Sequence, residues 1–156
     1  GLLHMPFGFG AMFGIGVLSR KLLPRFGRLL PCAGALLMAG SCALVLFGIG
    51  WGWSLISIAP GMVAAGIGMG MTTGCMGPIT FANVDRDHAG AASGLLKTCQ
   101  QLGSALGVAL VGSVYFIWAA SLGLGPSIVS GTLLAALLIG CGMTALRLPE
   151  RIFGQA

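Results

Sequence analysis

Polar side chains recur along one face of residues 93–119, a stretch that is otherwise apolar. At about 100° per residue in a helix, they fall within roughly 60° of one another's mean direction. They are Ser93, Lys97, Gln100, Gln101, Ser104 and Tyr115. The opposite face carries Leu95, Leu102, Leu106 and Leu110. An ammonium group, two amides and three hydroxyls can hydrogen-bond a polar solute, which favours a cavity-lining face. The same groups can also join neighbouring helices, and both interpretations stay open here.

The composition identifies the surroundings in which such a helix must lie. The chain has 156 residues, of which 56% are hydrophobic and only 7% are charged, and its mean hydropathy is +1.00. An ordinary soluble domain carries about 25% charged residues, so these charges are too few to cover a water-facing surface. This excludes a soluble enzyme, a disordered segment and a nucleic-acid-binding protein. The sequence predicts an all-α membrane protein in contact with the lipid bilayer.

Apolar runs of about 20 residues are long enough to span a bilayer as helices. The sequence predicts five of them, at residues 2–19, 30–50, 54–83, 93–119 and 128–146. The third run is too long for one straight span, and Pro60 and Pro78 are expected to bend it or to end it early.

The basic residues give an orientation to these spans. All eight flank the junctions on one side of the five-span arrangement, and they are Arg20, Lys21, Arg25, Arg28, Arg86, Lys97, Arg147 and Arg151. By the positive-inside rule that side is cytoplasmic. We therefore expect a multi-pass protein of the cytoplasmic (inner) cell membrane with its N-terminus outside and its C-terminus inside. The odd span number and the first residue, Gly1 rather than Met, indicate a fragment of a longer protein.

Glycine makes up 28 residues, many of them four positions apart. These G-x-x-x-G pairs are Gly10/Gly14, Gly66/Gly70, Gly70/Gly74, Gly90/Gly94 and Gly103/Gly107. Without side chains at such positions two helix backbones can approach closely, which favours association inside lipid. Thr73 shares roughly one face with the glycines of the third run. The pattern predicts a tightly packed helix bundle.

Residues of catalytic or metal-binding type are sparse and scattered. The five cysteines contain no C-x-x-C pair, and His4 is a lone histidine at the outer end of the first run. Asp85 and Asp87 are expected to cap the fourth span. Lys97 is interpreted as reaching to the interface or, alternatively, as binding an anionic group. We predict no enzymatic activity, no metal and no cofactor.

One continuous stretch, residues 84–110, carries a resemblance to a known family. Its sequence, VDRDHAGAASGLLKTCQQLGSALGVAL, resembles the C-terminal part of the fourteen-helix drug–proton antiporters of the major facilitator superfamily. The resemblance implies alternating access, with spans one, three and four beside a cavity for a small amphipathic or drug-like substrate and with protons as the coupling ion. Its candidate cavity residues are Thr73, Gln100, Gln101, Ser104 and Tyr115.

The chain departs from the family pattern in two places. In the cytoplasmic loop motif only Arg25, Gly27 and Arg28 match, since Arg20 and Pro24 stand where the family has glycine and an acid. The five spans contain no Asp or Glu, so the proton-handling residues are expected in a missing N-terminal half. The alternative interpretation is a free-standing five-helix membrane scaffold that assembles through its glycine faces without transport activity.

Overall fold

The computed structural model describes residues 4–27, 29–82 and 84–119, together with 131, 133–134, 136–140 and 143. Within these residues every regular element is a helix, in the order α1, η2, α2, α3, α4, η3 and α5. The all-α prediction is therefore confirmed for the part of the chain that the structure describes. The predicted fifth span, 128–146, lies only in part within it.

The first helical segment is longer and less regular than the sequence predicts. It runs through α1 (Met5–Phe13), the π-helical turn η2 (Gly14–Ser19) and α2 (Arg20–Phe26) without a break. Helix therefore continues seven residues beyond the predicted end at Ser19. Arg20, Lys21 and Arg25, expected in a loop between spans, lie on helix α2 instead.

Gly27 ends this segment with a backbone that other residues rarely adopt. Its φ is +47° and its ψ is −123°, while its N–H donates to the Leu23 carbonyl at 2.9 Å. Arg28, the last residue of the predicted loop motif, lies outside the described residues. The conformation explains why the motif carries glycine at this position, because a Cβ atom is strained at such angles.

Replacing Gly27 by alanine is expected to destabilise the full-length protein by about 1–2 kcal/mol, through strain at the positive φ. Unfolding in mixed detergent micelles would measure the loss. Gly40→Ala in the following helix is the matched control, since a Cβ atom there meets nothing within 4 Å. Equal stability of the two variants would contradict the strain argument.

The next two helices form an antiparallel pair. α3 (Leu29–Gly50) and α4 (Leu55–Phe81) are joined by a short turn in which Gly52 has φ +69°. Ser54 caps α4, because its side chain accepts a hydrogen bond from the Ser57 N–H at 3.4 Å. α4 continues through both Pro60 and Pro78, so the expectation of an early end is wrong.

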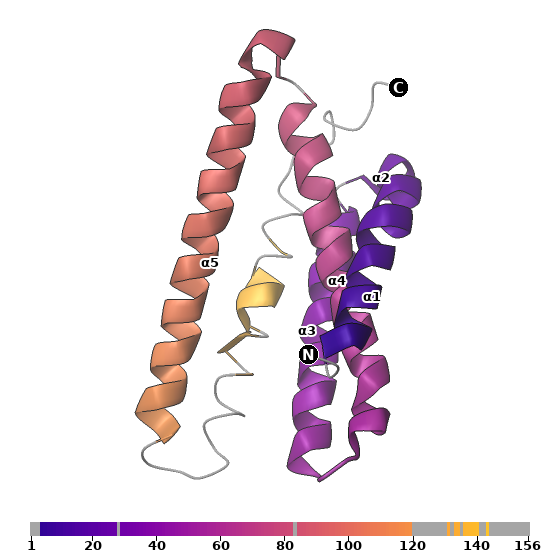
Figure 1. Cartoon of the computed structure of the whole chain (residues 1–156), viewed down its shortest axis with the longest axis vertical. Helices are drawn as coiled ribbons and strands as arrows, with labels where there is room; N and C mark the ends of the chain where they lie inside the picture. Colours follow the sequence, from indigo (N-terminus) through magenta and orange to yellow (C-terminus); the bar gives the residue numbers. More distant parts are fainter. Residues whose placement is uncertain are drawn as a thin grey trace.

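These helices build one bundle, with a further helix beside it (Figure 1). α4 packs against α3 on one side and against α1 and η2 on another. The α3–α4 turn lies at one end of the bundle, whereas α2 and η3 (Arg86–His88) lie at the other. The basic residues of α2 and Arg86 therefore gather at one end, as the charge pattern predicts.

α5 (Ala89–Ala119) begins beside the end of α4 and diverges from the bundle along its length (Figure 1). It starts four residues before the predicted position. Asp85 occupies the N-cap of η3, but its side chain makes no capping hydrogen bond there; instead its carbonyl accepts from the His88 N–H at 3.0 Å. Three described helices, α3, α4 and the η3–α5 segment, are long and apolar enough to cross a membrane.

Candidate functional site

The polar face of α5 is open in this structure. Ser93, Lys97, Gln101 and Ser104 are exposed, Tyr115 is 43% exposed, and Gln100 is partly buried. The leucines of the opposite face are also open, with exposed fractions between 56% for Leu110 and 67% for Leu95. The helix thus presents one polar and one apolar surface that the described residues leave uncovered.

Three hydroxyl groups of α5 donate their protons to carbonyl groups of the same helix. Ser93 Oγ donates to the Gly90 carbonyl at 2.8 Å, Thr98 Oγ1 to Gly94 at 2.9 Å, and Ser104 Oγ to Gln101 at 3.1 Å. Hydroxyl donors that bond back to their own helix need no partner on another helix. Ser93 and Ser104, the two of these residues on the polar face, therefore do not join helices within the described residues, which weighs against the interhelical interpretation of that face.

One side-chain contact connects the edge of the polar face to the bundle. Gln100 Nε2 lies 3.7 Å from Met76 Sδ of α4. Thr73 lies one turn before Met76 and is exposed. The structure therefore brings Gln100 to the α4 face that carries Thr73. Within the described residues, Gln101, Ser104 and Tyr115 make no side-chain hydrogen bond to the bundle.

The glycines of α4 lie against the first helical segment. A Cβ atom on Gly70 would lie 2.5 Å from the Ala11 carbonyl oxygen and 2.9 Å from Gly14 Cα. On Gly66 it would meet the Phe7 carbonyl oxygen, and on Gly10 the Val63 carbonyl oxygen. Backbone therefore touches backbone along this contact, which only residues without a side chain permit.

Gly74, the last glycine of this α4 pattern, makes a different contact. It is partly buried, whereas Gly70 is buried. A Cβ atom on Gly74 would meet the Ser19 hydroxyl first, with Ser19 Cβ at 2.8 Å and Ile15 Cα at 3.4 Å. The close backbone approach predicted for the Gly70/Gly74 pair is therefore formed at Gly70 alone. At Gly74 the missing side chain makes room for the Ser19 side chain instead, because the π-helical turn η2 directs that residue toward α4.

The glycines of α5 are placed differently. A Cβ atom on Gly103 or Gly107 would meet nothing within 4 Å among the described residues, and the same holds for Gly90 and Gly94. The close packing predicted for the Gly103/Gly107 pair is therefore not formed in the part of the chain that the structure describes.

Two packing features escaped the sequence analysis. Ser19 is 3% exposed, and the single proton of its Oγ is shared between the Gly14 carbonyl at 2.8 Å and the Gly70 carbonyl at 3.2 Å. On the α3 side, a Cβ atom on Gly68 would lie 2.6 Å from the Gly34 carbonyl oxygen. Ser19 was detectable as a hydroxyl residue within an apolar run, but the Gly34–Gly68 contact has no spacing signal of its own.

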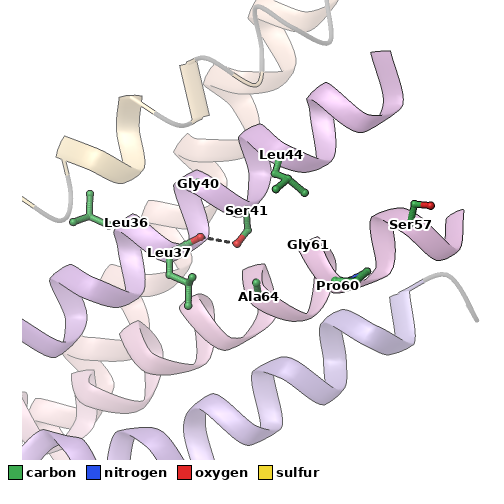
Figure 2. Close-up of a pocket in the computed structure, with 9 residues that line it drawn as sticks. All are labelled: Leu36, Leu37, Gly40, Ser41, Leu44, Ser57, Pro60, Gly61 and Ala64. Atoms are coloured by element: carbon green, nitrogen blue, oxygen red, sulfur yellow. Dashed lines mark hydrogen bonds between the residues drawn. The ribbon is translucent and has the colours of Figure 1, made fainter. Parts of the chain in front are cut away.

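A groove of about 400 Å³ runs between α3 and α4 (Figure 2). Gly61 and Ala64 lie on its α4 side and Leu36 and Leu44 on its α3 side. Ser41 donates its proton to the Leu37 carbonyl at 2.7 Å, so the groove offers few free donors. None of the predicted cavity residues lines it.

A second pocket, of about 410 Å³, contains the lone histidine of the first segment. His4, Phe7, Cys42 and Met62 are among its lining residues. Among the described residues no three His, Cys, Asp or Glu side chains come together in a way that could hold a metal ion. The polar face of α5 thus carries a wider range of hydrogen-bonding groups than either pocket.

The fold and this surface define a multi-pass membrane protein of helical type. The family model of the Major Facilitator Superfamily matches residues 1–108, and the chain belongs to that family. The prediction of the superfamily is confirmed, as is that of a partial all-helical bundle of this family.

Two curated relatives are similar to most of the chain. The protein named "Probable actinorhodin transporter" of Streptomyces coelicolor is 37% identical over 110 residues, which are 69% of this chain and 18% of that protein. The "Puromycin resistance protein" of Streptomyces alboniger is 33% identical over 118 residues, which are 73% of this chain and 23% of that protein. The chain therefore matches less than a quarter of the length of these relatives. No solved structure gives a significant match.

Proposed function

We propose that this chain is part of the C-terminal helix bundle of a proton-driven exporter of small amphipathic molecules in the cytoplasmic membrane. The observation that carries the proposal is the open polar face of α5, whose Ser93 and Ser104 hydroxyl protons are satisfied within the helix. Because these two hydroxyls need no hydrogen-bond partner on another helix, the face suits contact with water and solute. The names of the two relatives, which concern an antibiotic transporter and antibiotic resistance, support export over uptake.

In this proposal α1, α4 and α5 border the transport cavity, and Thr73, Gln100, Gln101, Ser104 and Tyr115 face it. The opposite wall and the proton-binding carboxylates belong to the longer protein, in keeping with the greater length of the relatives. Alternating access would then move this bundle against its partner bundle around a site near the midplane. Arg25, Gly27 and Arg28 would form part of the cytoplasmic loop that adjusts during this movement.

Transport by the full-length protein in proteoliposomes tests this function. With an imposed pH gradient, we expect uptake of at least one of fluorescein, rhodamine 123 and Nile red above that of protein-free vesicles. A protonophore should abolish this excess, because it removes the driving force. Absence of any gradient-dependent movement of the three dyes would contradict the proposal and favour the scaffold alternative.

A further inference from the structure

Lys97 is the one charged residue on α5, and its side chain is exposed. It lies eight residues after Ala89, or about 12 Å along the helix axis at 1.5 Å per residue. Intramembrane cations are costly unless they reach water or a partner. The position therefore places a positive charge on the polar face, between the cytoplasmic end of the helix and Ser104.

The described residues supply no carboxylate beside this charge. Asp85 and Asp87 precede α5 and are exposed, and they are the two acidic residues of the described chain. Helices α1 to α5 contain neither Asp nor Glu. Arg20, Lys21 and Arg25 add further positive charge at the same end of the bundle. Within the described part of the chain, Lys97 therefore has no acidic partner on helices α1 to α5.

The hydrogen-bonding groups near Lys97 on this face fall into two sets. Ser104 uses its proton within the helix, and the Gln100 amide contacts Met76. Within the described residues, the side chains of Lys97 and Gln101 make no hydrogen bond. Because residues at i and i+4 are neighbours, with Cβ atoms roughly 5–6 Å apart, the ammonium group and the amide can converge on one acidic oxygen group.

The neighbouring α4 face suits the remainder of such a molecule. Met76 is 36% exposed and Met69 is 37% exposed. The contact between Gln100 Nε2 and Met76 Sδ, which lie 3.7 Å apart, brings Gln100 of α5 to the level of Met76 on α4. Methionine side chains are flexible and polarisable, so they adapt to apolar bodies of different shape.

We infer that the surface formed by Lys97 and Gln101 of α5 and by Met76 and Met69 of α4 binds amphipathic anions selectively. Lys97 and Gln101 hold an acidic oxygen group, and Met76 and Met69 contact the apolar body. This inference rests on the proposed function, since it names the substrate class of the same face. It predicts that this surface binds anionic molecules with higher affinity than cationic molecules of the same shape.

Equilibrium binding of two xanthene dyes to the full-length protein tests the inference. Fluorescein is anionic near neutral pH and rhodamine 123 is cationic, while their ring systems are alike. We expect Lys97→Gln to raise the Kd for fluorescein about tenfold, the loss of one charge-assisted hydrogen bond, and to leave the Kd for rhodamine 123 unchanged or lower. Lys97→Arg should restore fluorescein binding to within about threefold of wild type, because it keeps the charge.

Lys21→Gln on α2 is the matched control, because it removes one exposed positive charge from the same end of the bundle but not from α5. It should leave the affinity for fluorescein unchanged. An equal loss in the Lys21→Gln and Lys97→Gln variants, or an equal effect of Lys97→Gln on both dyes, would overturn the inference while leaving transport intact. Failure of the wild-type protein to bind or move any dye would overturn the proposed function as well.

Discussion

Replacing Gly70 by alanine is expected to destabilise the full-length protein by about 3 kcal/mol, at the upper end of the usual cost of overpacking. The added Cβ atom would lie 2.5 Å from the Ala11 carbonyl oxygen, 2.9 Å from Gly14 Cα and 2.9 Å from the Ile15 nitrogen. All three are backbone atoms, so no side chain can rotate away, and α4 and the first helical segment must separate. Unfolding in mixed detergent micelles, followed by circular dichroism, measures the loss.

Gly77→Ala is the control within the same helix. A Cβ atom at Gly77 meets nothing within 4 Å among the described residues. Since alanine favours helix over glycine by up to about 1 kcal/mol, this variant should be as stable as the wild type or more stable. If both variants unfold alike, the α1–α4 contact does not carry the stability that the structure assigns to it.

Gly70 also shows how much of the fold was accessible from the sequence. The G-x-x-x-G spacing predicted close helix packing, and Gly70 does lie against the backbone of Ala11 and Gly14. The spacing carries no information about the partner, however, because any helix with a flat face can approach it. For the same reason it did not distinguish Gly74, which lies against the Ser19 side chain, or Gly103, where the described residues offer no neighbour.

Helix boundaries were predictable where the length of an apolar run sets them, and less predictable where local backbone geometry sets them. The α3 helix, Leu29–Gly50, lies within one residue of its predicted start. The first segment instead passes into the π turn η2, where Ser19 bonds to carbonyls of both η2 and α4. A tertiary contact of this kind supports continued helix through Arg20 and Lys21, and hydropathy alone places the end of the span before them.

The sequence predicted which side chains of the candidate site share one face of α5, but not which helices lie beside that face. Helical periodicity separated the polar face of α5 from its leucine face. The partly buried residues of α5 lie between the two, at roughly −140° to −40° from Lys97 for most of them; they include Ala92, Leu96, Gln100, Gly107 and Val111. Periodicity fixes directions around one axis, whereas the neighbour in each direction depends on the packing of the other helices.

A cysteine at position 104 is expected to react with a water-soluble thiol reagent about tenfold or more faster than a cysteine at position 106. Both side chains are open in the described structure, with Leu106 63% exposed, so protein contacts do not distinguish them. The difference must come from the surroundings, because the reactive thiolate forms in water and not in hydrocarbon. A cavity beside the polar face gives Ser104→Cys water, whereas the leucine face gives Leu106→Cys lipid.

The measurement uses the full-length protein in membranes, with its native cysteines replaced so that Cys99, which is exposed on α5, adds no signal. Maleimide labelling of the denatured protein provides the control that both cysteines are present in equal amount. Incubation with a dye that binds the protein, before the thiol reagent is added, should slow labelling at position 104 alone, since only that side chain faces the proposed cavity. Equal and slow labelling at both positions would place the polar face against protein or lipid, and would contradict a cavity beside this helix.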